Sequence, residues 1–231
     1  MRPDSLRVLL LSAACVLAAC RPSPTTTEDA GTPPVDNGQS DAGQPDAGPQ
    51  ADVARSKRNN LRFKGPERLT LDFAVALSLP PEQVCNELGQ YPCTTAVHTV
   101  ALGGVDPYGL GVYEPLPFTG ATTPIAVDRV ALAACVRRVT LDVTTPAEAV
   151  IFGGIGLDAQ GRLVDREGAP VRNAITALYQ RAMLRDPTEA EVGALLRLAT
   201  DIEGTSSQTP GRDWMKAACF VVLSSAESVF F

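Results

Sequence analysis

Apolar residues recur at helical spacing along the last sixty residues of the chain. Three stretches each place their apolar side chains on one face of a helix, namely Val171–Ala182, Val192–Ile202 and Trp214–Ser225. Asp186-Pro187 separates the first two stretches, and the polar loop Gly204–Gly211 separates the second from the third. The pattern therefore predicts three consecutive helices, the last running almost to the C-terminus.

Two of the predicted helices carry recognisable start signals. Thr188 and Glu191 have the spacing of a capping box, in which side chains and backbone amides of the first turn satisfy each other. Ile125–Val139 is apolar on most sides and follows Thr123-Pro124, so we expect a central helix capped by Thr123 with Pro124 in its first turn. Arg137-Arg138 would then lie in the last turn, at the negative end of the helix dipole. We expect the three later helices to pack on this central helix.

The first third of the folded part has weaker patterns. Glu67–Leu79 has helical spacing and ends at Pro80-Pro81, which can open a second short helix through Glu87. Residues 103–120 are rich in Gly and Pro and predict a loop or small hairpin, with residues 111–113 as a candidate strand. Farther on, Asp158–Gly161 predicts a turn between two short extended pieces. The expected fold class is mainly α, a compact helical domain with a Gly/Pro-rich loop or small hairpin region.

The N-terminus has the layout of an export signal. Arg2 and Arg7 supply positive charge, and the apolar stretch Val8–Ala19 that follows is too short to cross a bilayer as a helix. Leu17-Ala18-Ala19-Cys20 resembles the lipobox of bacterial lipoprotein precursors. The resemblance implies that residues 1–19 are removed and that the Cys20 thiol carries diacylglycerol. Ser12–Cys15 is a weaker second box, and an ordinary secretory signal or an uncleaved anchor remain alternatives.

A change in composition follows the predicted cleavage site. Residues 20–58 are dominated by Pro, Thr, Asp, Ala, Gly and Gln, with Val35 and Val53 as the only large apolar residues before residue 54. Such a segment has too few apolar side chains to bury for their burial to offset the conformational entropy lost on folding. We therefore expect a disordered tether between the lipid and a single domain over residues 59–231. Three Asp-Ala-Gly repeats, at Asp29, Asp41 and Asp46, are too irregular for a calcium motif. Arg21, in place of the Asp that retains some lipoproteins at the inner membrane, favours the outer membrane.

Four cysteines belong to the predicted domain: Cys85, Cys93, Cys135 and Cys219. An even number in an exported chain suggests two disulfides, for which three pairings are possible. We favour Cys85–Cys93, which closes a short loop, and Cys135–Cys219, which would join the central helix to the final one. Buried free thiols are the alternative.

Composition and charge exclude several functions. The formal net charge of −6 disfavours a nucleic-acid partner, because phosphate binding needs clustered Lys and Arg. His98 is the single histidine, the cysteine spacings are unlike those of zinc sites, and no Cys-x-x-Cys-His haem motif is present, so we predict no metal or cofactor. Gly153–Gly156 lacks the pattern of a nucleotide-binding loop and predicts a turn.

The C-terminal quarter also carries a resemblance. Ala177–Ala182, Arg185–Glu191 and Val222–Phe230 resemble a helical module of exported planctomycete and myxobacterial proteins, often found beside c-type haem domains. The resemblance implies a helical fold and an exported location, and it implies no reaction.

Three functions remain open. The first is a non-catalytic lipoprotein of the cell envelope, anchored in the lipid bilayer, that binds or assembles with an envelope protein. The second is a hydrolase in which His98 acts as general base, although no nucleophile motif accompanies it. The third is a structural spacer without a soluble partner.

Overall fold

The structure, a computed structural model, describes residues 61–115 and 120–231. The predicted signal, the tether and the lipidation site at Cys20 lie outside these ranges, so their predictions are not addressed by the fold. Among the described residues, no helix is both long and apolar enough to cross a membrane.

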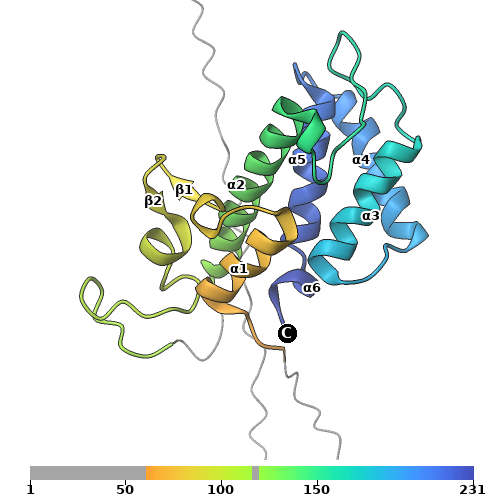
Figure 1. The fold of residues 1–231 in the computed structure, drawn as a ribbon. Coiled ribbons are helices and arrows are strands. Elements are labelled where there is room, and N and C mark those ends of the chain that lie inside the picture. The colour runs from red at the N-terminus through yellow and green to blue at the C-terminus, as the bar shows by residue number, and fades with distance from the viewer. Residues whose placement is uncertain (1–60, 116–119) are drawn as a thin grey trace, which may run out of the picture. The chain divides into compact units, whose positions relative to one another are not determined.

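The described residues form a mainly helical domain, which confirms the predicted fold class (Figure 1). α5 is the helix against which most others pack: α2 lies alongside it, and α3 and α4 contact it from the other side. α1 contacts both α2 and α3. The helices are α1 (Gly65–Leu77), α2 (Thr123–Thr144), α3 (Ala169–Met183), α4 (Glu189–Glu203), α5 (Pro210–Leu223) and the short α6 (Ala226–Val229). The expectation that all three later helices pack on α2 is therefore wrong, because α4 packs mainly against α5, and α3 packs mainly against α1 and α5.

The core between α2 and α5 is built from small and apolar side chains. Ala131 and Ala134 of α2 and Ala218 of α5 are fully buried, so little side-chain bulk separates the two helices. The disulfide Cys135–Cys219 joins them in this core. Trp214, also fully buried, donates its indole N–H to the carbonyl oxygen of Leu195 at 2.9 Å and so ties α5 to α4.

α2 is longer than its apolar pattern predicts, because a charged pair is buried in its last turns. Arg138 and Asp142 form an ion pair with a distance of 2.7 Å between Nη2 and Oδ1, and both side chains are almost fully buried. The Asp142 carboxylate also accepts the backbone N–H groups of Val150, Ile151 and Phe152 at 2.9 to 3.0 Å. The helix thus continues to Thr144, and the prediction that Arg137-Arg138 lie in its last turn is wrong.

Two other helix ends differ from the predictions. Thr123 is the first residue of α2, and its hydroxyl donates to the carbonyl oxygen of Ala101 at 2.7 Å and does not cap the helix. The final helix does not reach the C-terminus unbroken. α5 ends at Leu223, and Ser225 caps the separate α6 by accepting the N–H of Ser228. The Thr123 hydroxyl thus bonds a residue 22 positions earlier, which the linear pattern does not reveal, whereas the cap formed by Ser225 is local.

Residues 80–115 contain a hairpin, but at a different place from the predicted one. Pro80-Pro81 opens only a three-residue 3₁₀ turn, η1 (Pro81–Gln83), so the helix expected through Glu87 does not form. The chain instead pairs β1 (Asn86–Glu87) with β2 (Tyr91–Pro92) and continues into a π-helical turn, η2 (Cys93–Val97). Residues 111–113 form no strand, and Val112 makes only an isolated bridge with Asp106. The disulfide Cys85–Cys93 closes the hairpin at its base, next to the pair Asn86 and Pro92.

The remaining connections follow the sequence pattern closely. Asp158–Gly161 is the predicted turn, and it brings Leu157 and Leu163 together in an isolated bridge. The capping box of Thr188 and Glu191 is present at the start of α4. A short 3₁₀ turn, η3 (Pro146–Glu148), follows α2. Phe63 forms a bridge with Phe230, so the entry to the domain lies beside the last residues of the chain.

Candidate interaction groove

A groove of about 790 Å³ runs along the exposed face of α2. One wall is formed by the segment Gln83–Gly89, which includes the last residue of η1 and all of β1, and the floor is formed by α2. The floor residues recur at intervals of three and four along the helix and therefore share one face: Arg129, Leu132, Ala133, Val136, Arg137 and Thr140. A volume of this size is within the range of ligand-binding pockets.

The middle of the floor is apolar and open to solvent. The side chains of Leu132 and Val136 are 47% and 38% exposed, although they belong to a helix whose opposite face is fully buried against α5. At the hairpin turn, Leu88 is 87% exposed. Single exposed apolar residues are ordinary, but a cluster of them within one concave surface is typical of interaction sites.

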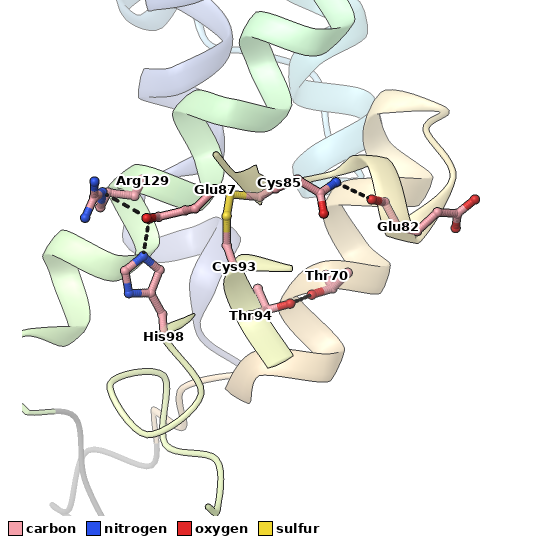
Figure 2. The surroundings of a disulfide bond; sticks show 9 residues. Thr70, Glu82, Cys85, Glu87, Cys93, Thr94, His98 and Arg129 are labelled. Carbon is pink, nitrogen blue, oxygen red and sulfur yellow. Dashed lines mark hydrogen bonds and ion pairs between the residues drawn. A yellow bond between two sulfur atoms is a disulfide. The ribbon is translucent and has the colours of Figure 1, made fainter. Parts of the chain in front are cut away.

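The groove is lined by three charged side chains, those of Glu87, Arg129 and Arg137. The Glu87 carboxylate lies between His98 and Arg129 (Figure 2): its Oε1 is 2.8 Å from His98 Nε2 and 3.4 Å from Arg129 Nε. These contacts connect the hairpin to η2 and to α2. Farther along the rim, Arg137 donates from Nη2 to the Gln83 amide oxygen at 2.9 Å. Among the described residues, no carboxylate forms an ion pair with Arg137.

The hairpin wall of the groove is held to the rest of the domain by a disulfide and by hydrogen bonds. The Cys85–Cys93 disulfide joins its two sides (Figure 2). The Cys93 N–H also donates to the Cys85 carbonyl oxygen at 3.1 Å. The Thr70 hydroxyl of α1 donates to the Thr94 hydroxyl of η2 at 2.7 Å. Cys93 and Thr94 are buried, so the wall rests on a packed base and the groove is held open by covalent and hydrogen-bonded constraints.

His98 has a carboxylate partner but no nucleophile beside it. Its side chain is 14% exposed, and its hydrogen bond is made to Glu87. The nearby hydroxyls bond elsewhere, since Thr94 is paired with Thr70 and Thr99 donates to the Thr94 carbonyl oxygen at 3.2 Å. No hydrogen bond joins His98 to a hydroxyl within the described ranges. The arrangement orients an imidazole, and among the described residues no side-chain nucleophile is joined to it.

A second polar cluster lies at the end of α3 and has a structural role. Arg185 forms ion pairs at 2.7 Å with Glu191 of α4 and with Glu227 of α6. Hydrogen bonds from Arg185 and from the Thr188 backbone lower the pKa of Glu191 to about 2, and Arg185 also lowers the pKa of Glu227. Burial, together with the charge of Glu191, raises the pKa of Tyr179, over whose ring Arg185 lies. The cluster fastens α6 to α3 and α4.

The predicted site residues fall in different parts of the domain. The four cysteines form Cys85–Cys93 and Cys135–Cys219, the pairing favoured from the sequence, and only the first of these disulfides borders the groove. In the part of the chain that the structure describes, no group of three or more His, Cys, Asp or Glu side chains could hold a metal ion.

The groove itself was missed by the sequence analysis. Leu132 and Val136 were counted among the apolar positions of a buried central helix, because such a helix is apolar on most sides. The available signal was the recurrence of Arg129, Leu132, Val136 and Arg137 on one face, opposite the face that carries Cys135 and Ala131. Glu87 and Arg129 could not be connected to His98 from their positions in the sequence.

The fold and the groove together define a helical domain that is crosslinked by two disulfides and carries a surface groove along α2. Comparisons with protein-family models, with curated proteins and with solved structures found no match to this chain.

Proposed function

We propose that the chain is a lipid-anchored protein of the bacterial cell envelope whose helical domain binds a partner protein and catalyses no reaction. Two features support the location. The first is the lipobox-like Leu17–Cys20 after a charged and apolar leader. The second is the presence of two disulfides, which form and persist in oxidising compartments outside the bacterial cytoplasm. Arg21 in place of Asp favours the outer membrane.

The groove on α2 is the observation that carries the binding function. It combines an exposed apolar floor with a charged rim and a covalently fixed wall, and these are properties of a preformed binding surface. A membrane anchor adds to such a surface by holding it at one place in the envelope, where the local concentration of the partner is high.

Lipid attachment is tested by replacing the two candidate cysteines separately. Cells expressing Cys20→Ser or the matched control Cys15→Ser are fed an alkyne fatty acid, and the protein is examined for label and for membrane association. We expect Cys20→Ser to lose the label and to remain as the unprocessed precursor, whereas Cys15→Ser behaves like the wild type. Label that persists on Cys20→Ser would show that the anchor assignment is wrong.

Binding through the groove is tested by photocrosslinking in intact cells. A photoreactive amino acid is placed at Leu132 in the floor or, as a control, at Val164, which is 68% exposed and lies outside the groove. We expect a discrete crosslinked species from position 132 that is missing from position 164. Equal crosslinking at both positions, or none at either, contradicts the proposed function, and the second result favours a structural spacer.

The hydrolase alternative rests on one observation, the 2.8 Å contact between His98 and Glu87. The purified full chain is assayed with ester, amide and glycoside substrates beside His98→Gln and Glu87→Gln. The binding function predicts no turnover by any of the three proteins. Turnover by the wild type that both substitutions abolish would establish the enzyme instead.

A further inference from the structure

The groove has a local charge that differs from that of the whole chain. The chain carries a formal net charge of −6, yet the ionisable groups lining the groove are two arginines and one glutamate. Glu87 is shared by Arg129 and His98, so its charge is already offset. Arg137 is exposed and is held only by the neutral Gln83 amide among its described contacts. The rim therefore presents a guanidinium charge that a carboxylate from outside can pair with.

The two arginines stand at opposite ends of the apolar floor. Arg129 and Arg137 are eight residues apart on α2, which corresponds to about 12 Å along the helix axis. Leu132, Ala133 and Val136 lie between them. A complementary ligand has two acidic groups at about this distance with apolar groups between, a spacing of about four residues in an extended peptide and about eight in a helix.

The walls favour a peptide over a lipid chain. Gln83 and Asn86 place amide groups along the hairpin side of the groove. Gln83 Oε1 accepts from Arg137 and Asn86 Nδ2 donates to the Glu82 carbonyl oxygen, so the second polar atom of each amide is left to bond a ligand. An acyl chain would cover these polar groups without offering hydrogen bonds, which is costly. A peptide backbone supplies donors and acceptors at regular intervals, and its side chains can still fill the apolar floor.

We propose that the groove binds a peptide segment in which two acidic residues flank apolar ones. One acidic side chain pairs with Arg137, and the other pairs with Arg129, whose guanidinium it shares with Glu87. This inference rests on the proposed function, since it names the chemistry of the partner that the groove accepts. The partner is a protein with an acidic and apolar surface segment, and electrostatic attraction to Arg137 contributes to its selection.

The proposal is tested with a library of random twelve-residue peptides displayed on phage and panned against the full chain in detergent. We expect enrichment of sequences with two acidic residues about four or about eight positions apart and apolar residues between them. A synthetic copy of the most enriched peptide should bind at least about tenfold more weakly to Arg137→Glu. It should bind within about twofold of wild type to the matched control Arg197→Glu, which changes an exposed arginine on α4.

Charge reversal of the ligand provides a second readout. A peptide whose acidic residue is replaced by lysine should recover affinity for Arg137→Glu, which also shows that this variant is folded. Enriched peptides without acidic residues, equal losses in both variants or no enrichment at all would overturn the proposal. Arg137-dependent binding of phosphatidylglycerol-containing vesicles without peptide enrichment would also overturn it and assign the groove to a membrane. If the photocrosslink from Leu132 persists in any of these cases, the groove still binds a partner protein and only the acidic-peptide proposal fails. Failure of the acidic-peptide proposal can therefore be distinguished from failure of the proposed binding function.

Discussion

The two disulfides differ in how strongly they should stabilise the domain, and the structure allows the difference to be worked out. Cys85 and Cys93 are eight positions apart, whereas Cys135 and Cys219 are 84 apart. A crosslink lowers the entropy of the unfolded chain more when it closes a longer loop. The perturbation consists of two double variants, Cys85→Ala/Cys93→Ala and Cys135→Ala/Cys219→Ala.

The chain-entropy relation converts these separations into free energies of unfolding. The loop closed by Cys135–Cys219 corresponds to about 4.6 kcal/mol at 25 °C, and the loop closed by Cys85–Cys93 to about 2.5 kcal/mol. All four residues are buried, with exposures of 8% or less, so the loss of sulfur contacts is similar in the two variants. The difference of about 2 kcal/mol between the two free energies of unfolding therefore measures the entropy of loop closure in the unfolded chain.

The assay is urea unfolding followed by the fluorescence of Trp214, the single tryptophan, which is fully buried. With a urea dependence of about 2 kcal/mol per molar, the long-loop variant should unfold about 1 M earlier than the short-loop variant. Equal midpoints, or a lower midpoint for Cys85→Ala/Cys93→Ala, would refute the reasoning. Such a result would mean that native packing around the hairpin outweighs the loop entropy.

Three further perturbations test other parts of the domain. Asp142→Asn keeps the shape of the side chain but leaves buried Arg138 without its counter-ion, so the free energy of unfolding should fall by about 3–5 kcal/mol; a loss below about 1 kcal/mol in urea unfolding contradicts this. Trp214→Phe removes the indole donor to Leu195 and should cost roughly 1–3 kcal/mol by thermal unfolding, whereas an unchanged melting temperature would show that the hydrogen bond is dispensable. The pKa of Glu191 is lowered from 4.5 to about 2, so the stabilisation from its pairing with Arg185 is present above pH 4.5 and is lost as the pH falls towards 2. Glu191→Gln should therefore show a smaller fall in melting temperature between about pH 6 and pH 2.5 than the wild type does, and equal falls would argue against this pair as an acid-sensitive contact.

The candidate site was predictable only in parts. The pairing of Cys85 with Cys93 follows from their short separation, because a nearby partner is found at a small entropic cost. The contact between Glu87, His98 and Arg129 could not be predicted in the same way. It depends on a hairpin that replaced the expected helix, and the register of that hairpin is set by the disulfide beneath it.

Local sequence determined the elements whose signals are complete within one or two turns. Examples are the capping box at Thr188, the turn at Asp158–Gly161 and the apolar stripes of α3 and α4. In the capping box and the turn, neighbouring residues supply the hydrogen-bond partners, and in the stripes the helical spacing is visible in the sequence itself. Only the tertiary structure decided where α2 ends and which of its faces is covered. Asp142 prolongs the helix by accepting N–H groups from residues eight to ten positions later, and α5 covers one apolar face while Leu132 and Val136 stay exposed. An apolar pattern states which side chains can be buried, whereas the packing of the other helices determines which of them are.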